Sequence, residues 1–261
     1  MKRIPELVML DLDGTLYVGK QAIPGAIDCL KVLRERDIQL RFLTNTTTQS
    51  HDELIAQLRV MGFTLEDEEL ISAPAAAKLE LLAIQQKLRR PVRIWPVVAD
   101  SIRQDFSEFF WDEQRPDFVV LGDIGDAWDL TLINRLFNVM HSGAELIALH
   151  KNRFWQTEGG LKADIGFFVA GLEYICSKNA RVMGKPNRAF FQQVLDSAHV
   201  DAINAMMVGD DIDSDVGGAQ QMGIRGCLVR TGKYRDAYAE QSTIRPNYIL
   251  DSIAGLDELL R

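Results

Sequence analysis

The chain has 261 residues, of which 47% are hydrophobic and 25% are charged. That composition is typical of a folded globular protein and excludes a disordered, a collagen-like or a disulfide-stapled chain. Lys and Arg number 29 against 37 for Asp and Glu, so the formal net charge is −8. Because a surface of that sign repels phosphate backbones and anionic lipids, we expect neither a nucleic acid nor a membrane as a partner.

Cysteine usage and targeting signals indicate the compartment. Cys29, Cys176 and Cys227 lie far apart, and none belongs to a CxxC pair, so neither a disulfide framework nor a thiolate metal site is indicated. The N-terminal stretch lacks the apolar core and cleavage site of a signal peptide. The longest weakly polar run, 165–172, is much shorter than the ~18 residues that a membrane span needs. We therefore expect a cytoplasmic protein.

Apolar runs alternate with segments of helical period at both ends of the chain, which predicts parallel strands joined by crossover helices. The expected elements near the N-terminus are a strand at 7–10, a helix at 24–36, a strand at 38–43 and a helix at 50–61. Those near the C-terminus are a helix at 187–198, a strand at 205–208, a helix at 214–222 and a strand at 226–229.

The middle of the chain reads as a second α/β stretch. Its expected strands are 92–95, 118–121 and 146–149, and its expected helices are 101–110, 130–141 and 163–175. We predict a core domain made of 1–73 and 180–261, with 74–179 inserted as a smaller domain.

The segment DLDGT, at residues 11–15, begins where the first apolar strand stops. Ligands of open parallel sheets bind outside the carboxyl ends of strands, so Asp11 and Asp13 are candidate site residues. Two acids so close repel each other unless a cation or a proton separates them. Gly14 allows the chain to turn sharply after them. The alternative is an acidic turn in which both side chains cap local amides.

Two more polar groups stand at ends of expected elements. Thr44 and Asn45 follow the second strand, where a hydroxyl and amides can bind phosphoryl oxygens, although the run also suits a helix N-cap. Lys185 precedes Pro186 and a helix, where a fixed ammonium would pair with a phosphate or an aspartate. The alternative for Lys185 is a solvated surface lysine.

The segment GDDIDSD, at residues 209–215, follows the strand at 205–208. Four carboxylates in a small site need a compensating cation, and hard oxygen ligands favour Mg²⁺ or Ca²⁺ over zinc. The alternative is that most of them cap the helix predicted at 214. We expect Asp210 to face the site and Asp213 to face solvent.

Taken together, strand-DLDGT, strand-TN, GKP before a helix and strand-GDDIDSD resemble the four motifs of the haloacid dehalogenase (HAD) superfamily. The segments TLYVGKQAIPGA, LIALHKNRFW and VMGKPNRAFF are similar to its IIA-cap branch. The resemblance implies an α/β fold with a Rossmann-like core, a parallel sheet with helices on both faces. It also implies an inserted α/β type II cap domain between Thr44 and Lys185, and it allows a homodimer.

The resemblance also implies a reaction. Asp11 would be the nucleophile that forms an aspartyl-phosphate, and Asp13 would be the general acid and base. Mg²⁺ would be held by the Asp11 carboxylate, the Asp13 carbonyl and the Asp210 carboxylate. The phosphoryl group would be bound by Thr44, Asn45 and Lys185, with Asp215 and Gly14 in support.

The leading hypothesis is a Mg²⁺-dependent phosphatase that hydrolyses a small phosphomonoester or phosphoramidate. The alternatives are a phosphotransferase or mutase that uses the same aspartyl-phosphate, and a catalytically silent binding protein. Four other features are read more simply: residues 122–126 as a capped loop, His150 as a structural residue or a specificity residue, 109–111 as core, and Gly159 with Gly160 as a turn.

Overall fold

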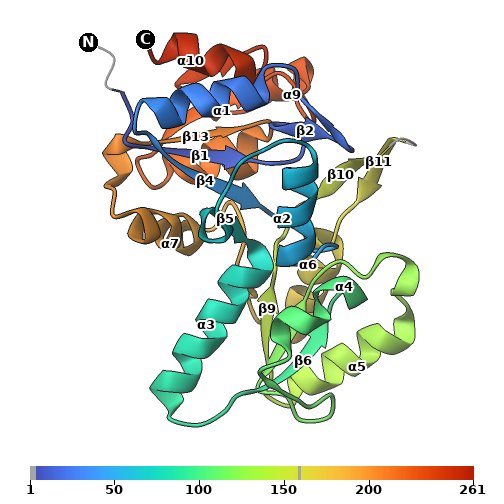
Figure 1. The fold of residues 1–261 in the computed structure, drawn as a ribbon. Coiled ribbons are helices and arrows are strands. Elements are labelled where there is room, and N and C mark those ends of the chain that lie inside the picture. The colour runs from blue at the N-terminus through green and yellow to red at the C-terminus, as the bar shows by residue number, and fades with distance from the viewer. Residues whose placement is uncertain (1–3, 158–159) are drawn as a thin grey trace. The chain divides into compact units, whose positions relative to one another are not determined.

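A computed structural model describes residues 4–157 and 160–261, which form two compact units (Figure 1). The first unit consists of Met1–Thr44, Leu54–Ile71 and Lys185–Arg261, and the second of Asn45–Glu53 and Ser72–Gly184. The domain limits expected from the sequence, 73/74 and 179/180, remain a prediction.

A six-stranded sheet forms the centre of the first unit, in the order β15-β14-β13-β1-β4-β5. The strands are β1 (Leu7–Asp11), β4 (Gln39–Thr44), β5 (Leu70–Ser72), β13 (Ala205–Gly209), β14 (Arg225–Val229) and β15 (Tyr248–Leu250). β1 pairs in parallel with β4 and with β13, Leu10 standing opposite Phe42 and Val208. The parallel strands expected from the apolar runs are confirmed. A separate antiparallel pair joins β2 (Tyr17–Val18) to β3 (Gln21–Ala22).

Central strand β1 is buried on both faces, because Leu7, Val8, Met9 and Leu10 all have 0% exposure. Val8 and Leu10 pack in one core cluster with Leu33 of helix α1. Figure 1 shows α1 and α10 on one side of the sheet and α7 on the other. The helices of the unit are α1 (Ala26–Glu35), most of α2 (His51–Val60), α7 (Arg188–Ala198), α8 (Gly218–Gln220), α9 (Asp236–Gln241) and α10 (Leu256–Leu259).

The second unit has its own parallel sheet, in the order β12-β9-β8-β6-β7. Its strands are β6 (Arg93–Val97), β7 (Phe110–Trp111), β8 (Phe118–Leu121), β9 (Glu145–Ala148) and β12 (Arg181–Val182), with an antiparallel hairpin of β10 (Phe154–Thr157) and β11 (Gly160–Ala163). Its helices are α3 (Ala73–Leu88), α4 (Asp100–Arg103), α5 (Leu130–His141) and α6 (Gly166–Cys176). Val120 and Val119 of β8 belong to separate core clusters, so this sheet is also covered on both faces.

Several details differ from the sequence expectations. Helix α3 was not expected, and the helix expected at 101–110 is only α4 followed by a short 3₁₀ turn. Phe109 is buried, but Phe110 and Trp111 are 62% and 39% exposed, so the assignment of all three to the core is wrong. Gly159 lies outside the described residues, and Gly160 begins β11. Among the described helices, none combines the length and hydropathy that crossing a membrane requires.

Candidate active site

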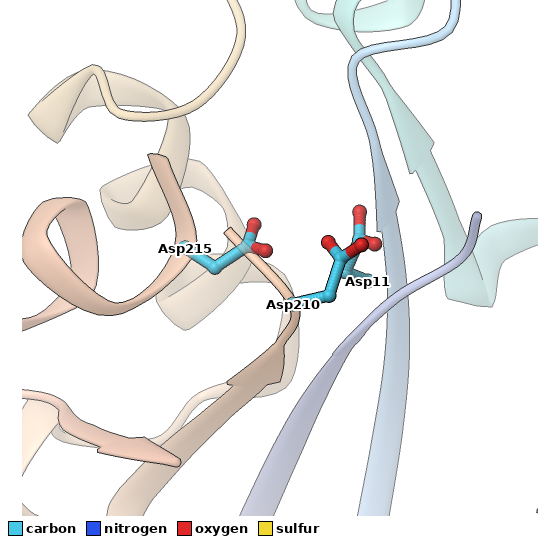
Figure 2. A group of neighbouring side chains, drawn as sticks. All are labelled: Asp11, Asp210 and Asp215. Atoms are coloured by element: carbon cyan, nitrogen blue, oxygen red, sulfur yellow. The ribbon is translucent and has the colours of Figure 1, made fainter. Parts of the chain in front are cut away.

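Three carboxylates meet at the carboxyl edge of the first sheet. Asp11 is the last residue of β1, Asp210 follows β13, and Asp215 lies in the short π-helical segment Ile212–Gly217. β1 and β13 are parallel neighbours, so both strands end at the same edge. One oxygen from each carboxylate lies within 4.8 Å of the other two. Figure 2 shows Asp215 pointing toward the other two side chains, which project from adjacent strand ends. The predicted meeting of Asp11 and Asp210 is thus seen in the first unit.

Lys185 is the cation of this cluster. Its Nζ lies 2.5 Å from Asp11 Oδ1 and 2.7 Å from Asp215 Oδ1, and its side chain is 2% exposed. Although burial acts to lower the pKa of Lys185, the two carboxylates raise it above its usual value. The alternative of a solvated surface lysine is therefore wrong, and the ammonium is a fixed charge between two acids.

Burial disfavours the ionised forms of Asp210 and Asp215. It raises the pKa of Asp210 well above 3.8, and the charges of Asp11 and Asp215 act in the same direction. Burial also raises the pKa of Asp215 to about 7, against the opposing effect of Lys185. Three carboxylates beside one buried ammonium make an oxygen-rich group that suits a hard divalent cation, because carboxylates outnumber ammonium groups. The donor set therefore fits Mg²⁺.

Glycines at two turns let the chain approach Asp210 closely. Gly14 has φ +88°, and a Cβ there would lie 2.0 Å from Asp210 Oδ2. Gly232 has φ +56°, and its Cβ would lie at the same distance from that oxygen. At both positions the backbone is left-handed and a Cβ would overlap Asp210 Oδ2, so only glycine fits without strain or a clash. Gly14 therefore leaves room for the Asp210 carboxylate, and its role in supporting the site stays a prediction.

The remaining residues of the first turn surround Asp11. Thr15 is fully buried, and its Oγ1 donates a hydrogen bond to Asp11 Oδ2 at 3.2 Å. Asp13 is exposed at the surface of the first unit. Partial burial and the charge of Asp11 raise the pKa of Asp13, whereas the charge of Lys233 lowers it. Thr44 ends β4 and is 3% exposed.

Asn45, the other residue expected to bind phosphate, belongs to the second unit. There its Nδ2 donates to Asn152 Oδ1 at 3.2 Å. Its proposed role in binding a phosphoryl group stays a prediction.

Some acids of the GDDIDSD segment lie in the site, and others cap the helical segment or face solvent. Asp211 Oδ1 accepts hydrogen bonds from the backbone amides of Asp213 and Ser214, both at 3.0 Å, so it caps the helical segment. Asp213 is exposed, as expected, and it accepts a hydrogen bond from the Tyr238 hydroxyl. Asp210 and Asp215 are buried in the cluster. Only part of this acidic run therefore serves as a helix cap.

Sequence reasoning missed the loop at 231–233, which follows β14. Thr231 Oγ1 donates to the Gly14 carbonyl at 2.5 Å, and the Lys233 amide donates to Asp210 Oδ2 at 2.6 Å. The loop thus joins the turn after β1 to the acid after β13. The sequence feature that could have indicated this loop is its position after β14, the strand next to β13 in the sheet.

Other candidates lie in the second unit. His150 is 4% exposed, and its Nε2 is 3.9 Å from Asp164 Oδ1; the structural and the specificity role both stay predictions. Lys151 is paired with Glu173 at 2.5 Å. Asp123 Oδ1 accepts a hydrogen bond from the Gly125 amide at 2.8 Å, as expected of a capped loop.

Comparison with known proteins agrees with this geometry. Two family models match: Haloacid dehalogenase-like hydrolase over residues 8–109 and HAD-hydrolase-like over residues 182–256. Haloacid dehalogenase-like hydrolase domain-containing protein 2 of Bos taurus is 35% identical over 261 residues, which are 100% of this chain and 98% of that protein. Phospholysine phosphohistidine inorganic pyrophosphate phosphatase of Homo sapiens is 34% identical over 259 residues, which cover 97% and 93% of the two chains.

A solved structure extends the likeness to the fold. The crystal structure of a glycerol phosphate phosphatase from Mycobacterium tuberculosis in complex with magnesium matches with a TM-score of 0.83 and 28% identity. The match covers 99% of this chain and 79% of that one. The chain therefore belongs to the haloacid dehalogenase-like hydrolase family and is a phosphatase of that superfamily. The expected fold class, a Rossmann-like core with an inserted α/β cap domain, is confirmed.

Proposed function

We propose that the protein is a Mg²⁺-dependent phosphatase that hydrolyses a small phosphomonoester or phosphoramidate through an aspartyl-phosphate at Asp11. The observation that carries the proposal is the placement of Asp11 at a strand end, 2.5 Å from a buried lysine and beside two further buried acids. Family membership supports it, and one relative is named as a phosphatase of phospholysine, phosphohistidine and pyrophosphate.

In the first step a carboxylate oxygen of Asp11 attacks phosphorus, and the bond from phosphorus to the leaving atom breaks. Asp13 gives its proton to that leaving atom. The raised pKa of Asp13 favours the protonated form that this step needs. In the second step Asp13 removes a proton from water, the water oxygen attacks phosphorus, and the Asp11 carboxylate is released with inorganic phosphate.

The same residues would hold Mg²⁺ through the carboxylates of Asp11 and Asp210 and the backbone carbonyl of Asp13. When bound, the ion supplies positive charge that balances the acids and the transferring phosphoryl group. Asp215 keeps Lys185 in place through the 2.7 Å ion pair, so it acts as a positioning residue. The magnesium in the related crystal structure supports this choice of metal.

Thr44, Asn45 and Lys185 would bind the phosphoryl oxygens. Lys185 is suited to this because its position is fixed by two carboxylates. We further propose that the second unit is a cap of the IIA type that selects the substrate. A cytoplasmic location and a cap-mediated homodimer complete the proposal.

Hydrolysis of p-nitrophenyl phosphate with and without Mg²⁺ tests the function. Asp11→Asn removes the nucleophile, and the loss expected is at least about a thousandfold with unchanged circular dichroism. Asp13→Asn should be similarly inactive. Asp213→Asn is the matched control, because it changes an exposed acid of the same segment as Asp210. An Asp11→Asn protein that keeps a tenth of the wild-type rate would rule out the aspartyl-phosphate. Transfer of phosphate to added alcohols in place of water would identify a phosphotransferase.

A further inference from the structure

The hydroxyl of Thr231 is bound to the turn that follows β1. Its Oγ1 donates a hydrogen bond to the Gly14 carbonyl at 2.5 Å. Thr231 comes two residues after β14, and β13 lies between β14 and β1 in the sheet. The bond therefore joins segments that follow two strands that are not neighbours. A threonine suits such a contact, because its branched side chain has few rotamers to lose.

Backbone hydrogen bonds hold the loop around Thr231 in place. The Arg230 amide donates to the Leu250 carbonyl of β15 at 2.9 Å. Two residues after Thr231, the Lys233 amide donates to Asp210 Oδ2 at 2.6 Å. The same short loop thus bonds to the Asp210 carboxylate through its backbone and to the turn after β1 through the Thr231 side chain. It therefore holds these two parts of the site at a fixed separation.

The turn after β1 is held on both sides of Gly14. The Gly14 N–H donates to the Tyr17 carbonyl at 2.7 Å, and the Gly14 carbonyl accepts the Thr231 hydroxyl. In a planar trans peptide, the Asp13 carbonyl points in the direction opposite to the Gly14 N–H. Because both of its peptide groups are bonded, Gly14 keeps its left-handed conformation, with φ +88°, and the direction of the Asp13 carbonyl is set.

We infer that Thr231 is a positioning residue for the metal site, because it fixes the direction of the Asp13 carbonyl, one of the proposed Mg²⁺ ligands. This inference rests on the proposed function, in which Asp11 and Asp210 supply the other protein ligands. Partners that orient the ligands of a metal typically contribute about 10- to 100-fold in metal affinity. Loss of the Thr231 hydroxyl should therefore weaken Mg²⁺ binding.

Calorimetric titration of the full chain with Mg²⁺ tests this inference without any turnover. Thr231→Val keeps the shape of the side chain and removes the hydroxyl, so we expect its Kd for Mg²⁺ to rise at least about tenfold. Thr231→Ser keeps the hydroxyl and should bind Mg²⁺ nearly as tightly as the wild type does. Thr231→Ala is a second variant without the hydroxyl, for use if the Val protein does not fold.

Ser197→Ala is the matched control. The Ser197 hydroxyl also donates to a backbone carbonyl, that of Val194, at 2.8 Å. Ser197 lies at the end of α7 next to Ala198, whose carbonyl accepts a hydrogen bond from Gln39 at the start of β4. This is the amino edge of the sheet, opposite the acidic cluster. Both Ser197→Ala and Thr231→Val should lower the free energy of unfolding in EDTA, but Ser197→Ala should leave the Kd for Mg²⁺ unchanged.

Equal Kd values for Thr231→Val and the wild type would overturn the inference and leave the proposed function intact, because the hydroxyl would then have a structural role alone. A Thr231→Ser protein that binds Mg²⁺ as weakly as the Val variant would also overturn it, since the hydroxyl would not be the cause of the loss. A wild type that binds no Mg²⁺ would overturn the proposed function and the inference with it. The two failures are therefore distinguishable.

Discussion

Asp215 and Lys185 form a buried ion pair, with 2.7 Å between the carboxylate Oδ1 and Nζ and no more than 2% exposure on either side chain. Asp11 contacts the same ammonium. Each charge of this group has lost most of its hydration, so each depends on the others for compensation. The behaviour of the site when one member changes follows from that dependence.

Lys185→Met should damage both stability and activity. Removing the ammonium leaves Asp11 and Asp215 buried without their cation, which is expected to cost about 3–5 kcal/mol in the free energy of unfolding. Activity should fall at least about a hundredfold, since the proposed donor to the phosphoryl group is lost. Urea unfolding and p-nitrophenyl phosphate hydrolysis measure the two effects. The exposed-site variant Lys31→Met should stay within about 0.5 kcal/mol of the wild type, and a Lys185→Met protein equally stable would contradict the pairing.

Asp215 should make the metal-free protein less stable as the pH rises. Its pKa is raised from 3.8 to about 7 by burial, so between these values the folded protein holds a proton that the unfolded chain has lost. The contribution of this group is therefore fully present below about pH 4 and declines up to about pH 7. Urea unfolding in EDTA across that range measures it. The stability of the wild type relative to Asp215→Asn should fall with pH, and a constant difference would show that Asp215 does not titrate there.

Mg²⁺ should stabilise the protein and be required for activity. A ligand that binds only the folded state at a hundred times its Kd adds ~2.7 kcal/mol to the free energy of unfolding. EDTA should abolish hydrolysis, and added Mg²⁺ should restore it. Asp210→Asn should raise the Kd for Mg²⁺ at least about tenfold, measured by calorimetry. Asp213→Asn, an exposed neighbour in the same segment, should leave the Kd unchanged. Full activity in EDTA would exclude the metal.

Gly14→Ala should impair the metal site through a steric contact. The new Cβ would lie 2.0 Å from Asp210 Oδ2, so this carboxylate must move. Gly19→Ala is a matched control, because Gly19 also has a positive φ, +60°, but has nothing within 4 Å of a Cβ. Both variants carry backbone strain of about 1–2 kcal/mol, and only Gly14→Ala should weaken Mg²⁺ binding. Equal Kd values for the two variants would show that the close approach is unimportant.

The core strands were predictable because apolar runs such as 7–10 are buried on both faces, as parallel strands are. Helix α3 was missed because its apolar residues do not form one stripe. Ala77 and Leu81 are buried, but Leu79 and Leu88 of the same helix are 56% and 47% exposed. The helix expected at 214–222 is replaced by the π-helical segment Ile212–Gly217 and a short α8. Periodicity does not distinguish such a segment from an α-helix.

The acids of the site were predictable from their positions after strands, since parallel strand ends share an edge. The pairing of Lys185 with an aspartate was predicted, but its nearly complete burial was not, because that burial depends on residues far away in the sequence. The contribution of Gly232 was also hidden. Gly232 matters because it has no side chain and a left-handed backbone next to Asp210, and hydrophobic periodicity indicates neither property.

The buried acids of this site set stability and catalysis against each other. Replacing buried charges by apolar side chains of similar size often makes a protein more stable. A directed-evolution experiment that selects only for heat resistance should therefore accept apolar replacements of Asp11, Lys185 and Asp215 made together. The survivors would be robust proteins that no longer turn over substrate. Selection for thermostability in this protein must be coupled to a screen for phosphate release.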